Sequence, residues 1–174
     1  MGKSKKSKKV AVAKRCSFIA MLFGIVSVAM FFRPVIAIRD SEVVFTGIQV
    51  SLGYSEKFLG VNIIYFDFSI LNLLTYALAL CGVIFALLSC LGKGKGLTYF
   101  IALVSFVVST ILFFMQVAVC VPNNGLEKLV GGLGSLLGQK VSVKDSLALS
   151  YGAIIGGVAS AIATVSLLAK KFIK

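Results

Sequence analysis

The chain alternates long apolar stretches with short polar segments. Apolar residues fill residues 16–38, 68–91, 97–121 and 147–169 almost without interruption. A helix needs about 20 apolar residues to cross the hydrocarbon core of a bilayer, and each stretch is long enough. The pattern predicts an all-α transmembrane fold, a tetraspan four-helix membrane bundle whose spans are these four stretches.

The charged residues predict how the chain is threaded. The segments 1–15, 92–96 and 170–174 carry lysine or arginine and no acid, whereas all six acidic residues fall within 39–67 and 122–146. Basic flanking segments resist translocation, while acidic residues count for little. We therefore expect a multi-pass protein of the cell membrane with both termini in the cytoplasm and with 39–67 and 122–146 as outer loops.

The first outer loop has the composition of a β-hairpin. Apolar and polar residues alternate from Val44 to Leu52, and a second β-rich run, Leu59 to Phe66, follows the sequence Gly-Tyr-Ser-Glu-Lys. Such runs predict two paired strands. Because a lone hairpin is marginally stable, a third strand is expected to join it, and the candidate is Lys140–Lys144.

The second outer loop predicts a short amphipathic helix. Its apolar residues recur on one helical face while glycine and small polar residues occupy the other. These apolar residues are Leu126, Leu129, Val130, Leu133, Leu136 and Leu137. The segment is expected to lie on the outer bilayer surface, on the hairpin, or against a protein partner.

Composition and charge agree with this class. Hydrophobic residues make up 59% of the 174 residues, and the mean hydropathy is +1.02. The net charge of +12 comes from the cytoplasmic segments, where lysines attract anionic lipid headgroups. Nucleic acid is not an expected partner, because no aromatic residue separates the lysines of Gly2–Lys9.

The end of the first span holds an arginine and a proline, Arg33 and Pro34. A basic head followed by an apolar run is typical of a signal peptide, but residues 16–32 exceed the usual length of its apolar core, which favours an uncleaved helix. Proline disfavours helical geometry at the preceding residue, so the helix is expected to end near Arg33, with the guanidinium at the outer headgroups and 34–38 extended. The alternative is a kinked helix to Ile38 with Arg33 buried.

Several polar residues fall at a similar depth in the predicted outer leaflet. A buried arginine needs a counter-ion, and Asp67 is the candidate because intramembrane charges usually pair. Ordinary hydrogen bonding between helices is favoured over a ligand site at this layer. The candidate polar layer consists of Arg33, Asp67, Asn72, Gln116 and Tyr151.

Small residues recur every four positions in the fourth span, at Gly152, Gly156, Ser160 and Thr164. Spacing of this kind lets two helix backbones approach closely in a membrane. In a chain with four spans, we expect this ridge to serve internal packing; self-association is the alternative.

Few residues are suited to catalysis or cofactor binding. The chain has no histidine, and no carboxylate lies inside a predicted span. The cysteines Cys16, Cys81, Cys90 and Cys120 form no Cys-x-x-Cys pair, which argues against disulfide exchange with a quinone. The sequence predicts neither an enzyme nor a catalytic, metal or cofactor site.

In threading and in its outer hairpin, the predicted architecture resembles that of the claudin-like tetraspan proteins. The Trp-Gly-Leu-Trp stretch and the cysteine pair of that family have no counterpart here, so no functional residue carries over. The preferred hypothesis is a scaffold, adhesion or accessory-subunit protein that contacts a protein partner or another copy through its outer segments. The alternative is a homo-oligomeric channel or transporter, and the third is a protector of the bacteriocin-immunity type.

Overall fold

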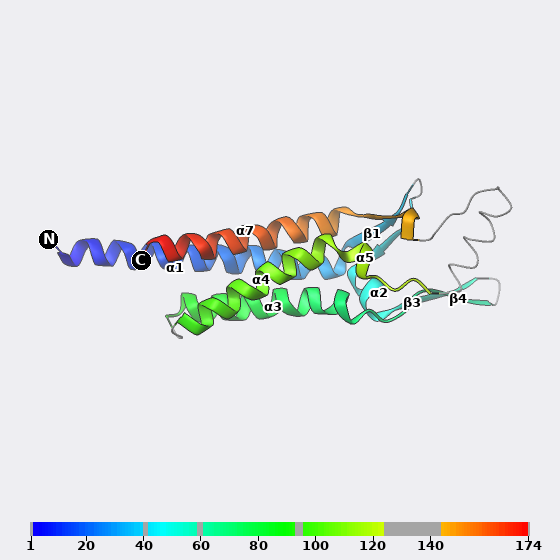
Figure 1. The fold of residues 1–174 in the computed structure, drawn as a ribbon, viewed down its shortest axis with the longest axis horizontal. Coiled ribbons are helices and arrows are strands. Elements are labelled where there is room, and N and C mark those ends of the chain that lie inside the picture. Colours follow the sequence, from blue (N-terminus) through cyan, green and yellow to red (C-terminus); the bar gives the residue numbers. More distant parts are fainter. Residues whose placement is uncertain (1, 40–41, 59–60, 93–95, 124–143, 174) are drawn as a thin grey trace. The chain divides into compact units, whose positions relative to one another are not determined.

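The computed structural model describes residues 2–39, 42–58, 61–92, 96–123 and 144–173, and it is mostly helical. Within these residues, four helices are long and apolar enough to cross a membrane. This confirms the four predicted helices and indicates a multi-pass membrane protein. The helices are α1 (Gly2–Ala29), α3 (Ile70–Cys90), α4 (Gly96–Phe114) and α7 (Tyr151–Ile173) (Figure 1).

The chain divides into two compact units. The helical unit consists of Met1–Ala29, Thr75–Ile111 and Ile155–Lys174, and the sheet unit consists of Met30–Leu74 and Leu112–Ile154. Each unit has a buried core of its own. The core of the helical unit contains Ala20, Ala86, Ala102, Phe106, Ala163 and Leu167. The core of the sheet unit contains Val35, Ile36, Phe45, Val50, Phe66, Cys120, Leu147 and Ala153.

One aromatic ring fills the space that glycines leave in the helical unit. A Cβ atom at Gly24 of α1 would lie 2.7 Å from Cζ of Phe106, and one at Gly82 of α3 would lie 2.9 Å from its Cε1. Phe106, on α4, is fully buried. Glycine at both positions therefore lets three helices meet around a single side chain, as small residues do at helix contacts in membranes.

Hydroxyl groups join the helices at the small-residue ridge of α7. Ser27 Oγ of α1 donates to the carbonyl oxygen of Gly156 at 3.0 Å, and Ser160 Oγ donates to the carbonyl oxygen of Phe106 at 3.0 Å. Thr164 Oγ1 donates within α7 to the carbonyl oxygen of Ser160. The ridge thus faces both α1, which lies beside α7 in Figure 1, and α4.

The outward faces of the same helices carry large apolar side chains. Leu22, Leu80, Ile111 and Val165 are all exposed, one on each of the four helices. Lipid tails are as apolar as leucine, so these faces cost nothing in a bilayer although they would be unfavourable in water.

A lysine connects three helices of the helical unit near the chain terminus. Lys170 Nζ, in the last turns of α7, donates to Ser17 Oγ of α1 at 2.9 Å and to Ser89 Oγ of α3 at 2.6 Å. A cation near a helix C-terminus is also favoured by the helix dipole.

In the sheet unit, β1 (Pro34–Ile38) is the central strand of a three-stranded antiparallel sheet of order β2-β1-β5. The edge strands are β2 (Val44–Thr46) and β5 (Leu147–Leu149), so that Ala37 is opposite both Val44 and Ala148. Proline has no N–H to donate and is accepted at the first residue of a strand. Residues 30–32 form a short 3₁₀ turn that ends α1 just before this strand.

A separate hairpin consists of β3 (Tyr54–Phe58) and β4 (Val61–Phe66), which pair antiparallel. The end of β4 also pairs with residues 121–122, which follow the short helix α5 (Gln116–Val119). Phe66 bridges to Pro122, and the backbone N–H of Asp67 donates to the carbonyl oxygen of Val121 at 2.9 Å.

The ends of three predicted spans differ from the helices of the structure. Residues 34–38 form β1, which confirms the expectation that they are extended after Arg33. Residues 147–149, predicted as helix, form β5 because β1 offers them a strand edge, and α7 begins at Tyr151. The third span, predicted to reach residue 121, is broken at Met115, between α4 and the short helix α5 (Gln116–Val119).

The predicted hairpin has a different pair of strands. The strand prediction for Val44–Leu52 is wrong beyond Thr46, because Gly47–Leu52 forms the helix α2. Thr46 caps this helix reciprocally with Gln49: Thr46 N donates to Gln49 Oε1 at 2.8 Å, and Gln49 N donates to Thr46 Oγ1 at 3.4 Å. Gly53, with φ of +91°, ends the helix. The sequence Gly-Tyr-Ser-Glu-Lys, expected between the strands, supplies most of β3.

Other predicted elements lie wholly or partly outside the residues that the structure describes. The amphipathic helix predicted over 126–137 lies outside the described residues, as do positions 140–143 of the candidate third strand. Lys144 begins the 3₁₀ turn η2 (Lys144–Ser146). The N-terminal segment 1–15, predicted as a tail, is helical from Gly2 as part of α1.

The start of α7 makes the closest backbone approach of the sheet unit. A Cβ atom at Gly152 would clash with the carbonyl oxygen of Pro34 in β1 and would lie 3.3 Å from Cβ of Arg33. Because the obstacle is backbone, no side-chain rotation relieves the clash.

We therefore expect Gly152→Ala to destabilise the protein by about 1–3 kcal/mol, the usual cost of overpacking a tight contact. Gly96→Ala is the matched control, since nothing lies within 4 Å of a Cβ atom there. Thermal unfolding of the detergent-solubilised variants measures the difference. Equal melting temperatures for the two variants would refute the close contact.

Candidate functional site

Two residues of the candidate polar layer are buried at the same level of the sheet unit. Asn72 and Gln116 are each only 1% exposed. Ser69 Oγ, at the start of α3, donates to the carbonyl oxygen of Val119 in α5 at 2.9 Å. Asn72 lies one turn after Ser69, and Gln116 lies one turn before Val119. The two amides therefore occupy adjacent helices at matching depth.

Among the described residues, neither amide atom of Asn72 has a hydrogen-bond partner, although its backbone N–H donates to Ser69 Oγ at 3.4 Å. A buried amide without a partner costs about 1–3 kcal/mol, and such groups are rare in folded proteins. The unpaired amide of Asn72 therefore lowers the stability of the sheet unit.

The other three members of the predicted layer are exposed. Arg33 and Asp67 are both exposed, and Tyr151 retains 51% of its accessible surface. Asp67 is not the partner of Arg33; its two carboxylate oxygens accept hydrogen bonds from Asn123 Nδ2, both at 2.9 Å. The layer therefore reduces to Asn72 and Gln116. Arg33 has no need of a buried counter-ion.

A cavity of about 260 Å³ lies among the strands of the sheet unit. The residues around it come from β1, the β1–β2 connection, β2, α2 and both strands of the hairpin. They are Ile38, Val43, Val44, Phe45, Gln49, Tyr54, Glu56 and Tyr65. None of the site residues predicted from the sequence lines this cavity.

Three aromatic rings pack together at this cavity. Tyr54 and Tyr65 are stacked with centroids 5.6 Å apart, and Phe45 lies 6.1 Å and 5.8 Å from them. The register of the hairpin shifts between Tyr54, opposite Phe66, and Ser55, opposite Ile64, so Tyr65 is an extra residue in a β-bulge.

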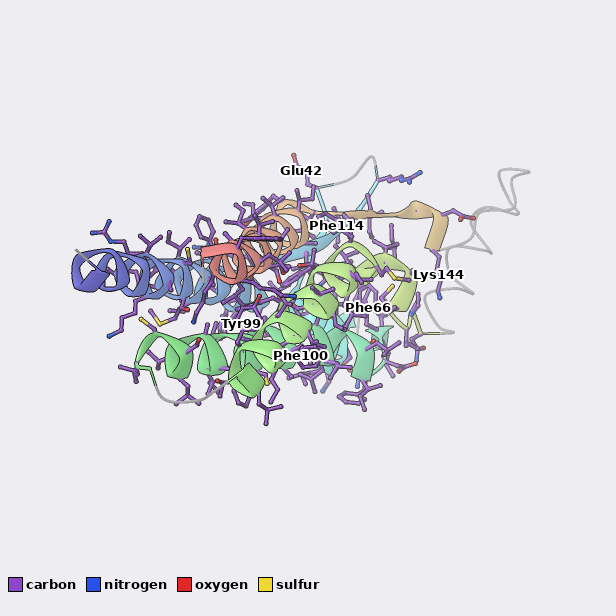
Figure 2. The ribbon with its side chains drawn as sticks, turned by 60° about the vertical axis from the view of Figure 1, so that its left-hand side comes forward. Glu42, Phe66, Tyr99, Phe100, Phe114 and Lys144 are labelled. Atoms are coloured by element: carbon purple, nitrogen blue, oxygen red, sulfur yellow. The ribbon has the colours of Figure 1, made fainter. Side chains whose placement is uncertain are left out.

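The bulge changes which side chains reach Phe45. Neighbouring residues of a regular strand point to opposite faces. Here, Tyr65 and Phe66 both contact Phe45, the latter edge to face at 4.8 Å. Phe66 is buried in the core of the sheet unit (labelled in Figure 2), whereas Tyr65 lines the cavity.

One carboxylate lies at the aromatic wall. Tyr54 hydroxyl donates to Glu56 Oε2 at 3.4 Å; the two residues are two positions apart on β3 and so share a face. Loss of solvent, followed by the negative charge of Glu56, raises the pKa of Tyr54 above its ordinary value of about 10, at which the phenol is already protonated at pH 7. A carboxylate accepts several hydrogen bonds, so Glu56 can accept from a ligand as well as from Tyr54.

The cap of α2 orients the amide of Gln49 at the cavity. Gln49 Oε1 accepts from both the backbone N–H and the hydroxyl of Thr46, at 2.8 and 3.1 Å. A sequence signal for this arrangement was present, since Thr-x-x-Gln is a capping box. The bulge at Tyr65 has no comparable signal, which is why the aromatic wall was missed.

Replacing Asn72 with an apolar residue tests the cost of its buried amide. We expect Asn72→Leu to raise the melting temperature, because it removes two unpaired polar atoms while keeping most of the side-chain volume.

Ser109→Ala is the control of opposite sign. Ser109 Oγ donates to the carbonyl oxygen of Thr75 at 2.9 Å, so its loss should lower the melting temperature. If Asn72→Leu destabilises the protein as much as Ser109→Ala does, the amide has a partner and the assignment is wrong.

Comparison with known proteins does not assign this chain to a family. No protein family, curated protein or solved structure matches the chain. The functional proposal therefore rests on the residues of the site.

Proposed function

We propose that the protein is a small integral membrane scaffold, adhesion or accessory-subunit protein that recognises a protein partner, or another copy of itself, through its sheet unit. The observation that carries the proposal is the cavity together with the apolar residues at its rim. Val43 and Val44 are 47% and 45% exposed although they lie outside the candidate spans. Apolar surface exposed beside a cavity is typical of a binding site.

The charge distribution supports an orientation for this role. Lysine and arginine without acid flank the spans at 1–15, 92–96 and 170–174. By the positive-inside rule, both termini are cytoplasmic and the sheet unit is on the outer side of the cell membrane. Anionic headgroups of the inner leaflet then neutralise the lysine-rich N-terminus.

The residues around the cavity are better suited to binding than to catalysis. The chain contains no histidine, and the described residues around the cavity include one carboxylate, Glu56. General acid–base catalysis commonly uses a pair of titratable groups held near the substrate. A single carboxylate beside aromatic rings is better suited to holding a ligand.

A homo-oligomeric channel or transporter is the second candidate, and it would place Arg33, Asn72, Gln116 and Tyr151 at an axis shared between copies. Asn72 and Gln116 are buried inside a single chain, whereas Arg33 and Tyr151 are exposed, so only the latter two are placed to face such an axis. No observation in the described residues specifically favours a protector of the bacteriocin-immunity type.

Site-specific photo-crosslinking in living cells tests the proposal. A benzoylphenylalanine at Val44 should give one discrete adduct, and its mass identifies the partner; a mass near twice 18.5 kDa identifies a second copy. The matched control position is Val165, which is 64% exposed on α7 and is expected to face lipid.

Two outcomes count against the recognition role. One is a folded protein that gives no discrete adduct from Val44. The other is the same adduct from Val44 and Val165, which would show contact without selectivity for the sheet unit.

A further inference from the structure

We propose that the cavity of the sheet unit receives a lysine side chain of the partner protein. The inference rests on the proposed function and names the chemistry that the site recognises. Its basis is the combination of an apolar rim, an aromatic wall and a single carboxylate within one small space.

The size of the cavity favours a single side chain as its occupant. At about 260 Å³, it is smaller than the roughly 300–1,000 Å³ of pockets that hold drug-sized ligands. Ile38, Val43 and Val44 make one part of its lining apolar. An occupant with a flexible aliphatic stem can cover these residues, as lysine stems do on apolar surfaces.

The negative charge of Glu56, which is exposed at the aromatic wall, favours a cationic end on that stem. Glu56 is the one charged residue among the described residues that line the cavity. The faces of tyrosine and phenylalanine rings also attract cations within about 6 Å. Glu56 and the rings of Tyr54 and Tyr65 therefore stabilise an ammonium group together, whereas an acidic side chain would be repelled by Glu56.

The hydrogen bonding of Glu56 favours lysine over arginine. Arginine binds carboxylates best through two parallel hydrogen bonds, one to each oxygen. Glu56 Oε2 accepts from the Tyr54 hydroxyl at 3.4 Å, so a guanidinium bound to both oxygens would have to share Oε2 with that hydroxyl. A compact ammonium needs only one such acceptor and uses its remaining donors elsewhere.

Titration of the full-length protein in lipid nanodiscs with N-acetyl-L-lysine amide tests the inference, with ¹³C-tyrosine NMR as the readout. Saturable shifts are expected at Tyr54 and Tyr65 and none at Tyr151, which is outside the cavity. Glu56→Gln should weaken binding about tenfold or more, because a hydrogen bond to a charged group is lost.

Glu42→Gln is the matched control variant. Glu42 is exposed, does not line the cavity and projects away from the strands (Figure 2), so its substitution should leave lysine binding unchanged. The matched control ligand is N-acetyl-norleucine amide, which has a similar stem and no charge. It should bind about tenfold more weakly than the lysine amide, since it forms no charged hydrogen bond.

The inference would be overturned if the lysine amide gave no saturable shifts, if the norleucine amide bound equally well, or if Glu56→Gln bound lysine amide as the wild type does. Tighter binding of O-phosphoethanolamine than of the lysine amide would also overturn it and would indicate a lipid headgroup. Failure of the proposed function is distinguishable, because it is measured by the adduct from Val44. A discrete adduct combined with no lysine binding would leave the recognition role standing and remove only the lysine.

Discussion

The sheet unit depends on the hydrogen bonding of β1 along both of its edges. Where the helix ends before Arg33, the backbone loses the internal partners that a helix provides, and a bilayer interior would offer none in exchange. β1 finds hydrogen-bond partners in β2 and β5, and two further hydrogen bonds extend its pairing with β5. Ser150 N donates to the carbonyl oxygen of Val35 at 2.9 Å, and Arg39 N donates to that of Ser146 at 2.8 Å. Pairing with β5 connects the segment after the first helix to the segment before the last.

That pairing explains the close contact at the start of α7. With β5 held against β1, the first turn of α7 passes beside Pro34, and only glycine at position 152 leaves room for the carbonyl group. β2, on the other edge, leads into the Thr46 cap and α2, and Gly53 then directs the chain into the hairpin. The cavity is thus enclosed by β1 and by the elements that follow it before the chain reaches α3, namely β2, α2 and the hairpin.

The parts of the fold that sequence predicted best are those set by composition. Four apolar stretches predict four helices because a bilayer demands about 20 apolar residues per span. The prediction failed in two places, for different reasons. Residues 147–149 are apolar enough for a span but become a strand because β1 offers them a tertiary partner. Gly47–Leu52 alternates like a strand but forms a helix that is capped locally by Thr46 and Gln49. At the site, the burial of Asn72 and Gln116 follows from their place on apolar helices, whereas the aromatic wall depends on a bulge at Tyr65 that no local pattern predicts.

The central claim is that the sheet unit is a recognition surface on the outer side of the cell membrane. Side-specific labelling tests it most directly, in a background whose four cysteines are replaced, with a membrane-impermeant maleimide applied to intact cells. We predict that Glu42→Cys, between β1 and β2, is labelled without permeabilisation, and that Lys171→Cys, near the end of α7, is labelled only after it. The reverse pattern would place the sheet unit in the cytoplasm and contradict the account.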